Sequence, residues 1–277
     1  MTPLDGAPTR QSRLASALTT SCGLMSLVRG GSGRPIVILH DLASSHGSLN
    51  ALAEDLKRNF QVVQVDLLGH GASDLRPLDL SISAQSDAVV EVLHDLGIHR
   101  PVLVGHSLGG SVAIRVAAYH PDLVGKLVLI SAGIYEYQFP LRWRLCRSRL
   151  GWHVLGLLGG PGAVERALRL ARVVSGNVRA SVNSIESSAG WAALGRAFRQ
   201  STSDAALSEL ERLSEDALTH PTLVIWGTEN QILPLASARV FFQGRRNVRF
   251  VEVAGTAHAV AEEAPRVVAD LIREFLG

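Results

Sequence analysis

The stretch Val102-Leu103-Val104-Gly105-His106-Ser107-Leu108-Gly109-Gly110 decides the fold. Its three leading apolar residues predict a short buried strand. A Gly-x-Ser-x-Gly turn follows, and residues 111–119 predict a helix with small residues near its start. In this strand–turn–helix context the motif indicates a sharp, strained turn that exposes the serine oxygen. Glycine at three positions of the stretch lets the strand and the helix approach closely, so Ser107 is the candidate nucleophile.

The length and the charge limit the classes of function. A chain of 277 residues can bury the core of one large domain, with or without an insertion. The 27 basic and 25 acidic side chains leave a net charge of +2, which indicates neither nucleic acid nor a membrane surface as a partner. No apolar run reaches the roughly 18 residues that span a bilayer.

Two cysteines, Cys22 and Cys146, cannot build a disulfide framework and are compatible with a reducing compartment. The apolar residues 14–18 follow two arginines and resemble a weak signal peptide, but polar residues interrupt the run at 19–21. Residues 22–29 then alternate as a strand does, and a glycine-rich turn follows. We therefore interpret the segment as part of the fold and expect a cytoplasmic protein.

Strand and helix patterns alternate along the first half of the chain. Strands are predicted at 36–39, 62–65, 102–104 and 126–130, and helices at 48–58, 83–96 and 111–119. This order predicts an α/β fold with a mostly parallel sheet and helices on both faces. Right-handed crossovers then place Ser107 at the carboxyl edge of the sheet.

The pattern changes between residues 134 and 217, where strand signals stop and helix formers dominate. Helices are predicted at 163–174 and 204–213. Strand patterns return at 221–227 and 248–253, and an amphipathic helix is predicted at 265–276. The sequence therefore predicts one catalytic domain in three parts: core at 1–133, a helical insertion at 134–217, and core again at 218–277.

Several motifs in this order resemble the α/β-hydrolase superfamily, in particular its cap-containing serine hydrolases of the esterase, lipase and haloperoxidase kind. Besides the elbow, residues 66–74 resemble its D-x-P-G-H-G-x-S-D loop, with Leu68 in place of proline. His258, Glu263 and Pro265 match its H-x-x-x-x-E-x-P loop. The resemblance covers about residues 19–133 and 218–277. It implies an eight-stranded sheet and a helical cap inserted after the strand that follows the nucleophile helix.

The resemblance also implies roles for single residues. His258 would be the general base, and the backbone amides of Leu42 and Leu108 would form the oxyanion hole, which stabilises negative charge on the carbonyl oxygen. His40, His70, His106 and the aspartates of the 66–74 loop would be structural. Asp41 stands where the family usually has glycine. We interpret its side chain as pointing away from the site and bonding to its own loop.

The third member of the expected catalytic triad departs from the family. Trp226, Gly227 and Pro234 match the pattern W-G-x-x-D-x-x-x-P, but Asn230 occupies the aspartate position. Asn230 could still orient His258 by accepting a hydrogen bond from the imidazole, without the charge that stabilises imidazolium. Alternatively Glu229, or an acid elsewhere such as Glu136, could replace the aspartate. A third interpretation is a partly disabled site, and a deliberate substitution is a fourth.

We therefore expect a hydrolase that acts on a small-molecule ester, thioester or lactone through an acyl-enzyme on Ser107, with His258 as the base. The alternatives are a lyase, cyclase or acyltransferase on the same fold, or a ligand-binding homologue with little turnover. We expect no metal or organic cofactor, because the sequence holds no H-E-x-x-H pair, no clustered Cys and His and no phosphate-binding loop. The sequence does not indicate the substrate or the oligomeric state.

Overall fold

An eight-stranded sheet forms the centre of the molecule. The computed structural model describes residues 14–76, 79–133, 147–157 and 187–277. The strand order in the sheet is β1-β2-β4-β3-β5-β6-β7-β8. The strands are β1 Leu14–Thr20, β2 Gly23–Gly30, β3 Pro35–Leu39, β4 Gln61–Val65, β5 Val102–His106, β6 Lys126–Ile130, β7 Thr222–Gly227 and β8 Val248–Val253. The pairs β1–β2 and β2–β4 are antiparallel and all others are parallel. The predicted fold class is confirmed.

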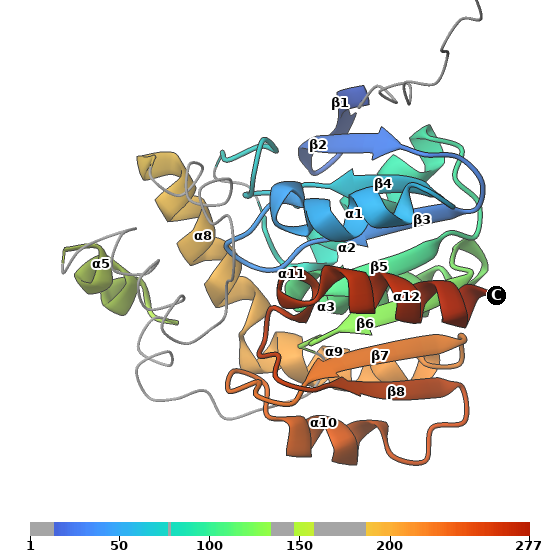
Figure 1. Ribbon diagram of the computed structural model, residues 1–277. Coiled ribbons are helices and arrows are strands. Elements are labelled where there is room, and N and C mark those ends of the chain that lie inside the picture. Colours follow the sequence, from blue (N-terminus) through green and yellow to red (C-terminus); the bar gives the residue numbers. More distant parts are fainter. Residues whose placement is uncertain (1–13, 77–78, 134–146, 158–186) are drawn as a thin grey trace, which may run out of the picture.

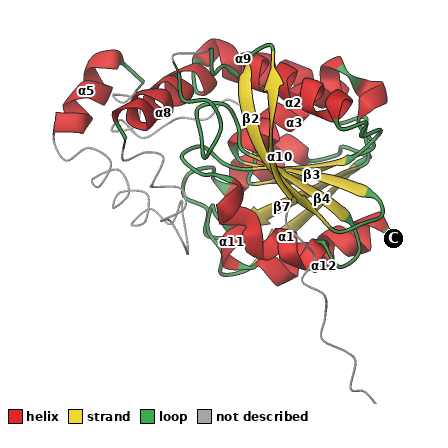
Figure 2. Ribbon diagram, turned by 90° about the horizontal axis from the view of Figure 1, so that it is seen from above, coloured by secondary structure: helices red, strands yellow, loops and turns green. Residues whose placement is uncertain are grey.

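Helices cover both faces of this sheet (Figures 1 and 2). One face carries α1 Asn50–Leu56, α11 Val260–Glu263 and α12 Pro265–Leu276, and the other carries α2 Ile82–Asp95, α3 Leu108–Tyr119, α9 Asp204–Ala217 and α10 Leu235–Phe242. Each face has its own apolar core, because the buried strands present side chains to both sides. Burial on both faces explains why the strands read as continuous apolar runs.

The predicted elements agree with the structure except at helix ends. Residues 14–30 form the hairpin β1–β2, which agrees with the interpretation that they belong to the fold. The helix predicted at 48–58 begins as the 3₁₀ turn His46–Leu49 and ends at Leu56. The nucleophile helix begins at Leu108, three residues earlier than predicted. The helix predicted at 163–174 lies outside the described residues, as do Glu136 and Cys146.

Three described helices come from the segment 134–217: α5 Arg149–Leu157, α8 Ser188–Ser201 and α9. Helix α9 packs on α3, and its Leu210 and Ala217 join the apolar core of that sheet face. Trp152 of α5 instead stacks on Trp191 of α8, with ring centroids 4.5 Å apart. The segment thus includes α9 in the core layer and α5 packed on α8, and α8 itself reaches the same core through Ala193 and Ala197. Its boundaries as a cap stay a prediction.

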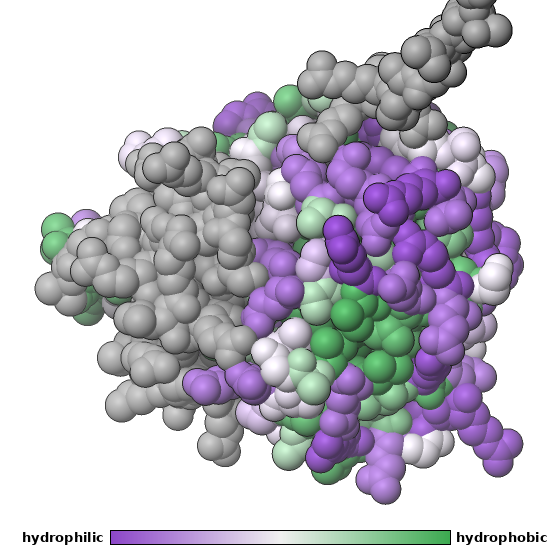
Figure 3. Space-filling view, viewed as in Figure 1, coloured by the Kyte–Doolittle hydropathy of each residue, from purple (hydrophilic) through white to green (hydrophobic). Residues whose placement is uncertain are grey.

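On the face drawn in Figure 3, the described residues are mostly hydrophilic, and a hydrophobic area lies between α12 and α10. It lies beside the edge strand β8, where Val251 of the strand and Leu271 of α12 are partly buried and Val267 of α12 is exposed. None of the described helices is long and apolar enough to cross a membrane.

The turn between β5 and α3 has the strained geometry that the motif predicts. Ser107 has φ 50° and ψ −111°, which is unusual for a residue with a side chain. The backbone of Gly109 lies against that of β3, so that a Cβ at this position would overlap the carbonyl of Leu39. The glycine is required by this close approach of helix to strand.

We predict that Gly109→Ala lowers the free energy of unfolding by about 1–3 kcal/mol, because the added methyl group meets fixed backbone. Urea denaturation measures the change. Gly30→Ala is the matched control, because there the methyl group meets only the Lys57 side chain, at 3.3 Å. Equal unfolding midpoints for the two variants would show that the elbow tolerates a Cβ.

Candidate active site

Four strand ends bring the candidate residues together at the carboxyl edge of the sheet. Asp41 follows β3, Ser107 follows β5, Asn230 follows β7 and His258 follows β8. His258 Nε2 lies 3.0 Å from Ser107 Oγ, although 151 residues separate them in the chain. The side chain of His258 is 2% exposed. The contact between the expected nucleophile and the expected histidine is therefore present.

The histidine loop is held from two sides. His106, which directly precedes the nucleophile, donates from Nε2 to the carbonyl oxygen of His258 at 3.0 Å. The carboxylate of Glu263 accepts the backbone N–H of Ala257 at 3.2 Å. These bonds explain the roles of the motif residues His106 and Glu263. Both residues hold the backbone of the His258 loop and thereby orient the His258 ring.

Asn230 contacts His258 through its nitrogen rather than its oxygen. Its Oδ1 accepts the backbone N–H groups of Ile232 at 3.1 Å and Leu233 at 3.0 Å. Its Nδ2 therefore faces the other way, 3.3 Å from Ser131 Oγ and 3.3 Å from His258 Nδ1. Turning the amide over would set its NH₂ group against two N–H donors. The expectation that Asn230 accepts a hydrogen bond from the imidazole is thus wrong.

This orientation sets the protonation of the histidine. Because Asn230 Nδ2 is a donor, His258 Nδ1 must be the unprotonated acceptor. A neutral imidazole carries one proton, so Nε2 bears it and faces Ser107 as a donor. A triad base needs the opposite tautomer, with Nε2 free to take the serine proton.

Glu229, the alternative acid, does not occupy the position beside His258 that Asn230 occupies. Glu229 has an exposed side chain, whereas Asn230 is buried against His258. The register of the motif therefore places residue 230, and not its neighbour, in the position of the third triad member. The other proposed replacement, Glu136, falls outside the described residues.

Asp41 points into the site, and the interpretation that it points away is wrong. Its Oδ2 lies 3.4 Å from His258 Nε2, the same ring nitrogen that contacts Ser107 Oγ. Burial alone raises the pKa of this carboxyl, but the hydrogen bond from His258, the largest opposing cause, holds the pKa well below its usual range. An ionised carboxylate therefore lies next to the nucleophile.

The same carboxylate changes the expected oxyanion hole. Asp41 Oδ1 accepts the backbone N–H of Leu42 at 2.5 Å, so the expected bond to its own loop does form. One of the two predicted oxyanion donors is thereby already paired with a negative charge. Leu108 is the first residue of α3, and the N–H groups of a first helical turn have no partner within the helix. Leu108 N–H is thus the donor that the elbow itself supplies.

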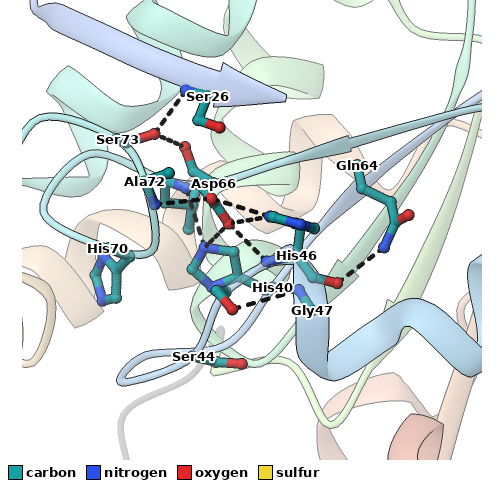
Figure 4. Close-up of polar contacts among 12 residues, drawn as sticks. Ser26, His40, Ser44, His46, Gly47, Gln64, Asp66, His70, Ala72 and Ser73 are labelled. Carbon is teal, nitrogen blue, oxygen red and sulfur yellow. Dashed lines mark hydrogen bonds and ion pairs between the residues drawn. The ribbon is translucent and has the colours of Figure 1, made fainter. Parts of the chain in front are cut away.

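A buried network under the site positions the loop that carries Asp41 (Figure 4). His40 Nε2 accepts the N–H of Leu67 at 3.0 Å, so its Nδ1 donates to the carbonyl oxygen of Asp41 at 2.6 Å. Asp66 accepts the backbone N–H groups of His46 at 2.6 Å and Ala72 at 3.0 Å. The bond to Ala72 lies within the 66–74 loop, as expected for a structural role, whereas the bond to His46 ties this loop to the segment after β3.

Burial keeps the neighbouring histidines neutral. It lowers the pKa of both His70 and His106 to about 4 and also lowers the pKa of His40. The donor atoms of Asp41, His106 and His258 lie within 4.8 Å of one another, a spacing that could hold a metal ion. A ligating nitrogen must be unprotonated, however, and Asn230 leaves the proton on His258 Nε2. The protonation that Asn230 sets therefore opposes a metal at this place.

We predict that ¹⁵N NMR of the protein at pH 7.5 finds His258 protonated at Nε2 and unprotonated at Nδ1. In Asn230→Asp the proton should move to Nδ1, because a carboxylate accepts there and fits the same two backbone donors. Ser131→Ala is the control, since it removes the other partner of Asn230 Nδ2 and leaves the amide orientation in place. A protonated Nδ1 in the wild type would contradict this assignment.

Comparisons with known proteins agree with this architecture. An uncharacterized protein of Mycobacterium tuberculosis is 30% identical over 260 residues, which cover 89% of this chain and 76% of that protein. The 2-(acetamidomethylene)succinate hydrolase of Mesorhizobium japonicum is 27% identical over 253 residues and 89% of each chain. Human monoacylglycerol lipase ABHD6 is 27% identical over 88% of this chain and 77% of its own.

Solved structures show the same fold. Cfl2 from Burkholderia cenocepacia superposes with a TM-score of 0.83 at 21% identity, over 98% of both chains. E-2-(acetamidomethylene)succinate hydrolase superposes with a TM-score of 0.73 at 23% identity, over 96% of this chain and 99% of its own. The model of the alpha/beta hydrolase family matches residues 36–271. With that match over most of its length, the chain belongs to the alpha/beta hydrolase family.

Proposed function

We propose that the protein is a hydrolase of small-molecule esters, thioesters or lactones that works through an acyl-enzyme on Ser107. The observation that carries the proposal is the 3.0 Å contact between Ser107 Oγ and His258 Nε2 at a strained elbow. Relatives named as a hydrolase and a lipase align with nearly the whole chain and support an enzyme of this class.

In this mechanism Ser107 Oγ attacks the carbonyl carbon and the carbonyl oxygen becomes an oxyanion beside Leu108 N–H. The leaving group departs, and water then attacks the acyl-enzyme and restores the serine. Both steps need a group that accepts a proton and returns it. By the family resemblance that group is His258, but Nε2 of its resting tautomer already bears a proton. Either this tautomer changes during the reaction or a second group accepts the serine proton.

The surroundings of the loop after β3 favour an apolar part in the substrate. Leu42 and Ala43 pack against a cluster of Trp152, Leu194 and Phe198 from α5 and α8. An ester with an apolar acyl or alkyl group could bury that group against such a surface. The polar atoms of the site would then fix only its carbonyl group.

A second candidate function is non-hydrolytic chemistry or ligand binding with little turnover. The carboxylate of Asp41 favours it, because a fixed negative charge at Leu42 N–H opposes an oxyanion in that place. The absence of an acid at position 230 points in the same direction, since an Asp-to-Asn change in this role costs about 10⁴-fold in turnover in a serine protease.

Labelling with a fluorophosphonate probe, read by intact mass, separates the two candidates. We predict that the wild type gains one probe mass and that Ser107→Ala gains none, because the probe bonds only to an activated serine. Ser111→Ala is the matched control. Ser111 Oγ donates to Gly133 O at 2.7 Å, one turn along the same helix. A folded wild type that stays unlabelled would contradict the acyl-enzyme and favour the second candidate.

A further inference from the structure

The two departures from the family pattern meet on one histidine. Asn230 contacts its Nδ1 at 3.3 Å, and Asp41 contacts its Nε2 at 3.4 Å. The usual constellation has a carboxylate at Nδ1 and no side chain at the glycine position. Here the carboxylate lies on the other side of the ring, next to the serine, which suggests that the two substitutions act together.

The hydrogen bonds between these groups run in one direction. Asn230 Nδ2–H donates to His258 Nδ1, because its oxygen is held by two backbone N–H groups. His258 Nε2–H then faces Ser107 Oγ at 3.0 Å. An oxygen that accepts this bond can donate its own proton elsewhere, and the carboxylate beside the same Nε2, with Oδ2 at 3.4 Å, is that of Asp41. The donors on Asn230 and His258 thus both point toward the side of the site where Asp41 lies.

We propose that Asp41, and not His258, takes the proton of Ser107, so that the relay runs from Asn230 through His258 and Ser107 to Asp41. This inference rests on the proposed acyl-enzyme. It makes Asp41 a catalytic residue, because its carboxylate receives the proton of the attacking hydroxyl. His258 becomes a fixed donor whose Nε2–H supports the oxygen atoms of the reaction.

The proton balance of the step is complete within the site. Ser107 Oγ bonds to the carbonyl carbon, its proton moves to Asp41, and the carbonyl π electrons move to oxygen. The oxyanion collapses, the bond to the leaving group breaks, and the proton on Asp41 passes to that group. Water then attacks the acyl-enzyme, gives one proton to Asp41, and Ser107 leaves with it.

The negative charge at the site moves but does not increase. In the resting state it resides on Asp41, and in the tetrahedral intermediate it resides on the oxyanion beside a neutral carboxylic acid. This removes the repulsion that an ionised Asp41 would exert on an oxyanion near Leu42 N–H. The same repulsion drives the transfer, because a second anion developing close by raises the proton affinity of a carboxylate.

The groups that face Asp41 allow this charge to stay on the carboxylate at rest. Among the described residues, the titratable groups near it are His40, His70, His106 and His258, and the backbone N–H of Leu42 donates to it at 2.5 Å. The hydrogen bond from His258 is the largest cause that holds its pKa well below the usual range against the effect of burial. A base of this kind stays ionised throughout the pH range 5–8, in which a histidine base loses its function on acidification.

The experiment is a double-mutant cycle on Asp41→Asn and Asn230→Asp, read as the rate of fluorophosphonate labelling of Ser107 between pH 5 and pH 8. In the wild type, Asp41→Asn should slow labelling by about 100-fold or more, the range expected for loss of a base. In the Asn230→Asp background the same change should cost no more than a few-fold, because His258 Nε2 is then free to act as the base.

The pH profiles give a second readout that a structural role of Asp41 would not change. The wild-type rate should be flat on the acid side down to pH 5, whereas the rate of the double variant should fall on acidification within this range, as expected for a histidine base. A wild-type profile with that acid limb overturns the proposal, and so does an Asp41→Asn single variant that labels within a few-fold of the wild type.

Two controls keep the outcomes distinct. Asp270→Asn makes the same chemical change on the exposed face of α12, where Asp270 pairs with Arg273, and should label at the wild-type rate. Asp41→Gly repeats the test with the residue usual in the family, in case the asparagine variant folds poorly. Absence of labelling in every chain, including the Asn230→Asp variants, would overturn the acyl-enzyme itself as well as the relay.

Discussion

The close packing of the first turn of α3 against β3 and β5 is the constraint on which the site depends. Because Gly109 touches the backbone of Leu39, the helix begins directly after Ser107, and the serine must adopt a left-handed backbone. That backbone lifts the hydroxyl above the sheet edge, where the loops after β3, β7 and β8 converge. The same packing directs Leu108 N–H, at the start of the helix, toward the same edge.

The polar atoms around Ser107 are held largely by backbone groups. Asn230 Oδ1 is fixed by two amides of its own loop, His258 by a bond from His106 to its carbonyl oxygen, and Asp41 by the N–H of Leu42. Such bonds leave each side chain little freedom to turn over. Donor and acceptor roles in the site are therefore consequences of the fold, and can be read from heavy-atom positions alone.

The sequence predicted the fold class, the position of the site at the carboxyl edge of the sheet, and the contact between Ser107 and His258. Local periodicity and motif spacing are enough to determine these features. The register at Trp226 and Pro234 likewise identified Asn230 as the residue beside the histidine. The sequence did not predict which end of its amide faces the ring, since that depends on the N–H groups of Ile232 and Leu233 in the folded loop. It also misplaced the carboxylate of Asp41, whose partners at positions 107 and 258 are distant in the chain.

Asparagine and aspartate have almost the same shape, and the loop around residue 230 offers either of them the same two amide donors. Exchanging one for the other would leave the path of the main chain unchanged. It would, however, reverse the direction of hydrogen-bond donation between residue 230, His258 and Ser107. Two enzymes of this family could thus overlay atom for atom and still differ in which residue is acidic during turnover. For such pairs, a close superposition of coordinates does not establish that the two enzymes share a reaction mechanism.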